Sequence, residues 1–263
     1  MGYTVRTATA KSRHHDKNED SFFVTDDRLI IIADGMGGEH DGDVASQMAV
    51  RTIADKLCLR MTDGMSPQEV RELSFEAIRK ADEKIRSYTL SHPDSSGMGT
   101  TAIIVLCDAS RFCISWCGDS RCYGYNRLRG VRSLTKDHSY VQELIDSGRL
   151  TEEEALTHPD NNLITRFVGG GPETCIPDFI TGEIGDNDIF VICSDGLSGY
   201  CKNSEIEHTI RQTSDIGKLA GNLLDLAVKQ GSDDDITVVT ISNDRSKSSL
   251  FGRLYHTLQG KRD

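Results

Sequence analysis

The order of the apolar segments constrains the fold of this chain more than any other feature of its sequence. Residues 29–33 have the pattern of a buried strand, and the turn at Asp26-Asp27 joins them to residues 21–25 as a hairpin. Two segments with apolar residues three or four apart follow, at residues 44–59 and after the capping box that starts at Ser66. Paired strands followed by paired helices predict an α+β fold with segregated layers rather than alternating βαβ units.

The second half of the chain predicts mainly strands. Residues 101–107, 112–117 and 121–125 have the pattern of a meander, with turns at residues 108–110 and 118–120. Short polar helices are expected over residues 137–159, a strand over 189–193, a helix over 216–228 and a last strand over 236–241. No linker divides these elements, so residues 1–243 are expected to form one domain and residues 244–263 a polar, basic C-terminal tail.

The composition excludes several classes of protein. The chain has 263 residues and a formal net charge of −11 at pH 7, and such a field repels nucleic-acid backbones and anionic membrane surfaces. No apolar run approaches the roughly 18–20 residues of a membrane span, and the N-terminus lacks the apolar core of a signal peptide. We therefore expect a cytoplasmic protein that binds no nucleic acid and has no membrane span.

The eight cysteines have the pattern of reduced core residues. They include no Cys-x-x-Cys pair and mostly lie within apolar runs, which favours a cytosolic protein over a disulfide framework. Cys113, Cys117 and Cys122 have a second interpretation as zinc ligands. Their spacing fits a strand, a turn and a strand better.

Four aspartates, Asp34, Asp119, Asp195 and Asp234, share one kind of position, where an apolar strand begins or ends. Strand ends within one sheet system lie on a common edge, so these carboxylates are expected to converge. Converged carboxylates repel one another unless cations neutralise them, and an all-oxygen ligand set suits Mg²⁺ or Mn²⁺. Two such ions about 3.5–4 Å apart activate a water for attack on a phosphoryl group.

The alternative interpretation of each aspartate is a turn residue. Asp-Gly and Gly-Asp-Ser sequences are common at hairpin corners, and Asp233-Asp234-Asp235 also has the pattern of a solvated run of charge. The repetition of the same strand-end position favours the metal site over four unrelated turns.

The aspartates belong to a larger ordered set of motifs. The set comprises Asn18-Glu-Asp20, Asp34-Gly-Met-Gly-Gly38, Gly99-Thr-Thr101, Gly118-Asp-Ser-Arg121, Leu134-Thr-Lys-Asp-His-Ser139, Ile164-Thr-Arg166, Ser194-Asp-Gly196 and Asp234-Asp-Ile-Thr237. Together they resemble the metal-dependent type 2C protein phosphatases, in particular their bacterial branch, from about residue 10 to residue 241.

The resemblance implies a four-layer αββα sandwich, in which two antiparallel β-sheets are flanked by helix pairs and a metal site lies at one end. Carried over by position, Asp34 bridges two tightly bound Mn²⁺ or Mg²⁺ ions, and Gly35 offers its carbonyl to one of them. Asp195 and Asp234 hold the other ion, and Glu19 acts through bound water. Asp119 matches an aspartate linked to a weaker third ion. Residues 137–170 resemble an elaboration before the substrate flap, and residues 171–182 fall in the flap.

The sequence departs from the family pattern at two positions. Where relatives place an arginine to hold the substrate phosphate, this chain has His15, with Arg13 two residues earlier; Arg13, His15 and Lys17 are the candidates for that role. Where eukaryotic relatives have a histidine proposed as general acid, this chain has Met36, as bacterial members commonly do. His40 lies nearby in the glycine-rich loop, where a histidine is more often simply exposed.

The resemblance implies a protein serine/threonine phosphatase that hydrolyses phosphoserine and phosphothreonine by direct attack of a water that bridges the two ions. The expected partners are phosphorylated proteins and a cognate Ser/Thr kinase, and the expected state is a monomer. One alternative is a catalytically weak phospho-binding regulatory module, a pseudophosphatase of the same fold. A metal-dependent phosphodiesterase or nuclease is a further alternative, which the net charge of −11 disfavours.

Overall fold

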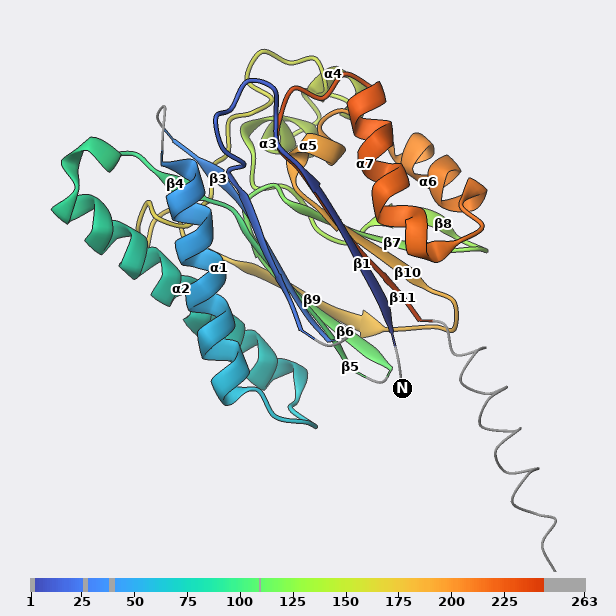
Figure 1. The fold of residues 1–263 in the computed structure, drawn as a ribbon, viewed down its shortest axis with the longest axis horizontal. Coiled ribbons are helices and arrows are strands. Elements are labelled where there is room, and N and C mark those ends of the chain that lie inside the picture. Colours follow the sequence, from blue (N-terminus) through green and yellow to red (C-terminus); the bar gives the residue numbers. More distant parts are fainter. Residues whose placement is uncertain (1–2, 26–27, 38–40, 109, 244–263) are drawn as a thin grey trace, which may run out of the picture.

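Two antiparallel β-sheets stack face to face at the centre of the molecule (Figure 1). The computed structural model describes residues 3–25, 28–37, 41–108 and 110–243. Sheet I contains, in spatial order, β1 (Thr4–Ala10), β11 (Ile236–Ser242), β10 (Ile189–Cys193), β7 (Arg121–Asn126) and β8 (Gly130–Ser133). Sheet II contains β2 (Asp20–Val24), β3 (Leu29–Met36), β5 (Ala102–Asp108), β6 (Arg111–Cys117) and β9 (Asp178–Glu183), with the short β4 (Gly99–Thr100) paired to β3.

Helices cover both outer faces of this pair of sheets. The helices α1 (Gly42–Arg60) and α2 (Pro67–Ser91) pack on sheet II, and α6 (Asn203–Gln212) and α7 (Leu219–Lys229) pack on sheet I (Figure 1). Shorter helices are η1 (Pro93–Ser95), α3 (Tyr140–Asp146), α4 (Glu152–Ala155), α5 (Asp195–Ser198) and η2 (Ile216–Lys218). The predicted four-layer αββα sandwich is confirmed.

The alternation of side chains along β3 shows why the layers form. Ile30 and Ile32 enter the core between the two sheets, whereas Leu29, Ile31 and Ala33 enter the core between sheet II and the helices α1 and α2. Successive side chains of a strand point to opposite faces, so a strand buried on both faces has an uninterrupted apolar run. The same property makes the sequence of residues 29–33 continuously apolar.

The predicted start of α2 is confirmed atom by atom. The Ser66 hydroxyl oxygen accepts a hydrogen bond from the Glu69 backbone N–H at 3.3 Å, and the Glu69 carboxylate accepts one from the Ser66 backbone N–H at 2.8 Å. Pro67 occupies the first turn, where its missing N–H costs nothing. A capping box of this kind is local, so the sequence alone predicts it.

The predicted meander over residues 101–125 is wrong at its second turn. β5 pairs with β6 in sheet II, but β7 pairs with β10 and β8 in sheet I. Gly118 has a φ of +119° and donates its N–H to His138 Nδ1 at 3.1 Å, and here the chain crosses from one sheet to the other. Asp119 therefore lies at the junction of the two sheets rather than in a hairpin within one of them.

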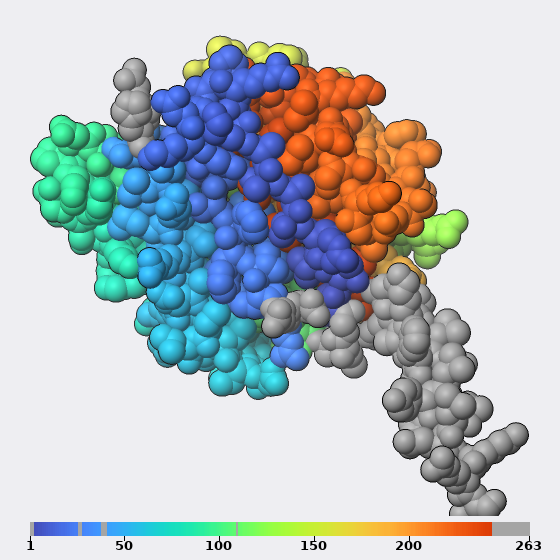
Figure 2. All heavy atoms as spheres, viewed as in Figure 1, coloured from blue at the N-terminus to red at the C-terminus, as the bar shows by residue number. Residues whose placement is uncertain are grey.

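Several elements have no counterpart among the predicted ones, and the longer of these are β1, β8, β9 and α6. β1 pairs with β11 along its whole length, from Thr4 opposite Ser242 to Ala10 opposite Ile236. Figure 2 shows the result, with the N-terminal segment in dark blue packed directly against the C-terminal elements in orange and red. These strands are short or carry few large apolar residues, so pairing with a distant partner forms them rather than their own pattern.

The cysteines are all free thiols, and seven of the eight are buried, as expected; Cys58 on α1 is exposed. Across the described ranges, no helix has the length and apolar character that a membrane crossing requires. The predicted tail over residues 244–263 lies outside the described residues.

The core between the sheets yields a stability prediction. Ile192 is fully buried there, and Ile192→Ala is expected to lower the free energy of unfolding by about 2–5 kcal/mol, through lost burial and the cavity that remains. Leu128→Ala is the control, because Leu128 is 94% exposed and its truncation is expected to cost less than about 0.5 kcal/mol. Urea unfolding followed by circular dichroism measures both, and equal losses would contradict this account of the core.

Candidate functional site

Asp34 lies near the end of β3, and its backbone is fixed from two sides. Its N–H donates to Thr101 Oγ1 at 2.9 Å, and its carbonyl accepts from the Thr101 N–H at 2.8 Å. The Thr101 hydroxyl is also bonded to the Ser120 hydroxyl at 2.7 Å, in the crossing between the sheets. The position of Asp34 is therefore coupled to the segment that carries Asp119.

Asp195 lies one residue after the end of β10 and begins the short helix α5. Beside it, the Ser194 hydroxyl donates to Asp20 Oδ2 at 2.7 Å and accepts the Thr237 N–H at 2.9 Å. These bonds join strands of both sheets. The Asp195 and Asp34 carboxyls each shift the pKa of the other, so one carboxyl group from each sheet lies at the place where the two sheets meet, here called the seam.

Two glycines are required by the close approach of backbones around this seam. A Cβ on Gly35 would lie 2.0 Å from the Gly42 carbonyl oxygen and 2.8 Å from that of Glu19. A Cβ on Gly196 would lie 2.0 Å from the Asp235 carbonyl oxygen. Glycine is the residue that permits such approaches, which brings the segments bearing Glu19, Asp34, Asp195 and Asp234 together.

The four predicted aspartates influence one another's pKa values, which indicates that they lie in one neighbourhood. Burial, followed by the charge of Asp195, raises the pKa of Asp34 well above its usual range, and Asp20, Asp234 and Asp119 add to the shift. Burial and then Asp195 likewise raise the pKa of Asp119, and they raise the pKa of Asp234 to about 6. Each carboxylate thus disfavours the ionised form of its neighbours.

This arrangement fits hard divalent cations. The Asp195 Oδ1 and Asp20 Oδ1 atoms are buried and have no hydrogen-bond partner within the described part of the chain. Buried polar oxygens without a partner cost free energy, and repelling carboxylates cost more. An oxygen-only donor set of this charge suits Mn²⁺ or Mg²⁺. Such a cation would bind the oxygens that lack a partner and would neutralise the repulsion among the carboxylates.

Asp20 and Asp235 contribute to the site although the sequence analysis assigned them no role. Asp20 is 8% exposed and lies opposite Asp34 in the β2–β3 register. Burial raises its pKa well above the usual range, Ser194 and Thr237 oppose the shift, and Asp195 adds to it. Its place beside Glu19 in the Asn18-Glu-Asp20 motif and its pairing across the predicted hairpin were the available signals.

Asp235 holds the segment before β2 in place. Its Oδ1 atom accepts the Ser12 N–H at 2.6 Å, and its Oδ2 atom accepts the Glu19 N–H at 2.7 Å and contacts His15 Nδ1 at 2.9 Å. Within the described residues, one group of three His, Cys, Asp or Glu side chains has potential metal-ligand atoms that all lie within 4.8 Å of one another. This group comprises His15, Asp234 and Asp235. Because both oxygens of Asp235 already accept hydrogen bonds, we assign it to positioning this segment rather than to binding an ion.

Glu19 lies beside the seam, with its side chain over Gly42. A Cβ on Gly42 would lie 2.4 Å from Glu19 Oε2, and the Glu19 carbonyl accepts the Gly35 N–H at 3.1 Å. Burial raises the pKa of Glu19, a nearby His15 lowers it, and Asp235 and Asp43 raise it further. Glu19 is therefore near the Asp34-Gly35 corner, where its predicted role requires it.

The three candidates for holding a phosphate differ in the contacts that they already make with acidic residues. His15 is hydrogen-bonded to Asp235, and Lys17 forms an ion pair with Asp43 at 2.9 Å. Arg13 is exposed, and none of the described residues forms an ion pair with it. Burial lowers the pKa of His15, but the hydrogen bond and charge of Asp235 outweigh it, so the pKa is raised overall.

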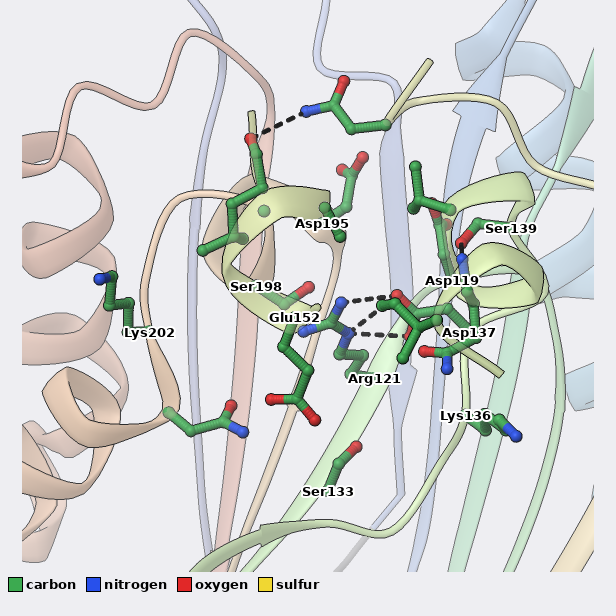
Figure 3. Close-up of a pocket in the computed structure, with 18 of the residues that line it drawn as sticks. Asp119, Arg121, Ser133, Lys136, Asp137, Ser139, Glu152, Asp195, Ser198 and Lys202 are labelled. Carbon is green, nitrogen blue, oxygen red and sulfur yellow. Dashed lines mark hydrogen bonds and ion pairs between the residues drawn. The ribbon is translucent and has the colours of Figure 1, made fainter. Parts of the chain in front are cut away.

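Asp119 is buried beside a bidentate ion pair. Arg121 donates from Nε and from its terminal nitrogen to the Asp137 carboxylate at 2.8 and 2.6 Å, as Figure 3 shows. His138 accepts the Gly118 N–H at Nδ1 and faces Asp178 from Nε2 at 3.2 Å. The segment that follows β8 thus holds the turn around Asp119 in place.

The remaining predicted features are placed only in part. Met36 ends β3, and its side chain lies near Gly99. His40 lies outside the described residues. The start of the predicted flap is anchored by the buried Asp82 of α2, which accepts the N–H groups of Gly169 and Gly171 at 2.7 and 3.0 Å.

Two stacked antiparallel sheets with partly unsatisfied carboxylates at the place where they meet are the architecture of a protein that binds divalent cations between its sheets. The sequence matches the family described as "Protein phosphatase 2C" over residues 8–223. The chain belongs to the protein phosphatase 2C family, which confirms the resemblance, the expectation of a phosphoprotein phosphatase and the Mn²⁺ or Mg²⁺ cofactor at the level of the family.

Named relatives agree with this assignment. The chain is similar to "Serine/threonine phosphatase stp" of Listeria monocytogenes, with 32% identity over 247 residues that cover 93% of this chain and 96% of the relative. It also resembles the crystal structure of the Mycobacterium tuberculosis serine/threonine phosphatase PstP/Ppp, with a TM-score of 0.82, 31% identity and coverage of 93% and 100%. A structure of the PstP catalytic domain in complex with two manganese ions matches with a TM-score of 0.78, 30% identity and coverage of 91% and 97%.

The raised carboxyl pKa values predict how the stability of the metal-free protein varies with pH. The native state holds the Asp234 proton up to a pKa of about 6, whereas the unfolded chain releases it near its ordinary 3.8. This stability is present at low pH and is lost as pH rises through the folded pKa, and the raised pKa of His15 acts in the same direction. Chelated protein is therefore expected to lose about 1 kcal/mol from Asp234 alone between pH 5.0 and 7.5.

Urea unfolding in the presence of a chelator measures this slope. Asp234→Asn is expected to flatten it, because the amide does not titrate. Saturating Mn²⁺ is expected to reverse it, because cations compete with protons for the carboxylates. Chelated wild-type protein that gains stability over this range would contradict the assigned repulsion.

Proposed function

We propose that this protein is a protein serine/threonine phosphatase that hydrolyses phosphoserine and phosphothreonine at a centre of two Mn²⁺ or Mg²⁺ ions. The observation that carries the proposal is the meeting of Asp34 and Asp195 from the two sheets, with Asp195 Oδ1 buried and without a partner among the described residues. When bound, the ions supply an activated water and neutralise the charge of the phosphate.

The proposed ligand roles are those that the family resemblance implies. Asp34 would hold both ions, Gly35 would offer its carbonyl to one of them, and Glu19 would act on that ion through water. Asp195 and Asp234 would hold the second ion, and Asp119 would hold a weaker third one. The mutual influence of these carboxylates on their pKa values supports the grouping.

The thiols support direct attack by water over a cysteine nucleophile. Burial raises the pKa of Cys107 and Cys193 to about 12, and it raises that of Cys122 as well, so these groups are protonated at neutral pH. The exposed Cys58 lies on α1, in the helix layer outside sheet II. We therefore assign the attack on the phosphate to water, and we assign the residues of this chain to binding and orienting the phosphate.

Metal removal tests the proposed centre. Exhaustive chelation is expected to abolish hydrolysis of p-nitrophenyl phosphate and of a phosphothreonine peptide, and Mn²⁺ or Mg²⁺ is expected to restore both. Asp34→Asn and Asp195→Asn are each expected to lower metal affinity and turnover together, because each removes charge that holds a cation. Calorimetric metal titration paired with kcat measures both quantities.

Asp119→Asn provides the contrast within this experiment. Its assigned ion is the weakly held one, so two ions are expected to remain bound while turnover falls strongly. Turnover that survives chelation would overturn the two-ion centre. Full metal binding without turnover of either substrate would instead favour the pseudophosphatase alternative.

The phosphate contact gives a second prediction. Arg13 is expected to hold the substrate phosphate, since His15 and Lys17 already have acidic partners. Arg13→Ala should raise KM about tenfold or more, as expected for a lost charge-assisted hydrogen bond, and His15→Ala should raise it less. Steady-state kinetics on a phosphopeptide decide between them, and the reverse ranking would assign the phosphate to His15.

The wider role of the protein follows from this activity as a proposal. Its partners are phosphorylated proteins and the Ser/Thr kinase that modifies them, and we expect it to act as a cytoplasmic monomer. The net charge of −11 is consistent with a protein that avoids nucleic acid.

A further inference from the structure

A cavity of about 480 Å³ opens beside the carboxylate seam, with Asp119 and Asp195 among its lining residues (Figure 3). One wall comes from α3, α4 and the segment that precedes α3, and the opposite wall comes from α5 and the start of α6. Its volume lies within the range of about 300–1,000 Å³ typical of ligand sites and is more than a phosphoryl group fills. The cavity therefore has room for a substrate side chain next to the phosphorylated residue.

The positive charges that line this cavity are already compensated. Arg121 pairs with Asp137, Lys136 with Asp146 at 2.6 Å, and Lys202 with Glu153 at 3.1 Å. In Figure 3, Lys136 and Lys202 lie on opposite sides of the cavity, with the Arg121–Asp137 pair between them. An acidic side chain that entered would have to compete with these pairs.

Apart from the aspartates of the seam, Glu152 is the charged side chain of this cavity that has no ion-pair partner among the described residues. It lies in the first turn of α4 and lines the cavity, and none of the described residues forms an ion pair or a side-chain hydrogen bond with it. In the metal-loaded protein proposed above, the aspartates of the seam are neutralised by their ions, so Glu152 carries the uncompensated charge of the cavity. This negative charge favours a cation.

Aliphatic side chains line the cavity as well. Val141 and Ile145 of α3 and Leu156 after α4 contribute apolar surface to the wall that also carries Glu152. Lysine and arginine side chains combine an apolar stem with a charged end, so they fit a wall of this composition better than a short or an acidic side chain does.

We propose that this cavity is a specificity subsite that takes a lysine or arginine side chain of the substrate from a position close to the phosphorylated residue. Glu152 pairs with the charged end, and Val141, Ile145 and Leu156 pack against the stem. The proposal rests on the phosphatase activity proposed above, and it adds a preference for phosphosites with a basic neighbour.

Phosphothreonine peptides with Arg, Ala or Glu at each of the three positions on either side of the phosphorylated residue test the subsite. At one or more positions, the wild-type protein is expected to have a kcat/KM for Arg about three- to tenfold higher than for Glu. Glu152→Gln is expected to remove most of this preference. Glu152→Lys is expected to invert it, while kcat/KM for the all-Ala peptide changes little.

Glu183→Gln is the matched control. Glu183 lies opposite Arg111 at the far end of β9 from the Asp119 crossing, and its loss removes the same charge without touching the cavity. An Arg-to-Glu ratio that Glu152→Lys leaves unchanged at every position, or that Glu183→Gln changes equally, overturns the subsite. The all-Ala peptide keeps this outcome separate from failure of the proposed function, because its hydrolysis does not depend on the subsite.

Discussion

The repulsion among buried carboxylates at the seam between the two sheets is the interaction on which the rest of this structure depends. Asp34 belongs to sheet II and Asp195 follows a strand of sheet I, so the sheets must be held together against the charge that they carry. The fully buried apolar side chains between the sheets, among them Ile32, Ile103 and Ile192, provide that cohesion. The apolar core thus holds the two sheets together although the repulsion among the carboxylates favours their separation. A bound cation removes this repulsion.

Hydrogen bonds between distant segments give the seam its precision. The Ser194 hydroxyl bridges Asp20 and Thr237, and Asp235 binds the backbone of Ser12 and Glu19. These contacts join residues more than 40 positions apart in every case, so they form only in the complete fold. Residues 12–19, which carry Arg13 and Glu19, are therefore positioned by β11 and the loop that precedes it.

The same seam continues into the cavity proposed as a subsite. Asp119 and Asp195 contribute to both, and the Arg121–Asp137 pair lines the cavity next to them. The segment after β8 has two functions in this arrangement. It supports the Asp119 crossing through His138, and it leads into α3 and α4, which form one wall of the cavity. This one segment thereby connects the proposed catalytic site at the seam with the proposed specificity subsite.

Local signals in the sequence were enough for much of the fold. The capping box at Ser66, the continuous apolar run at residues 29–33 and the hairpin before it depend on neighbours within a few residues. The four aspartates were also recognisable, because a strand end is a local feature and family motifs surround each of them. Fold class, family and the main carboxylates therefore follow from the sequence.

Tertiary structure alone decided the rest. The crossing of β6 to β7 between sheets, the pairing of β1 with β11 and the burial of Asp20 depend on partners far away in the chain. Neither the hydrogen bonds of Asp235 nor the lack of a partner for Glu152 within the described part of the chain has a pattern of its own in the sequence. A charge acquires its role from what lies within a few ångströms of it, and only the folded chain determines that distance.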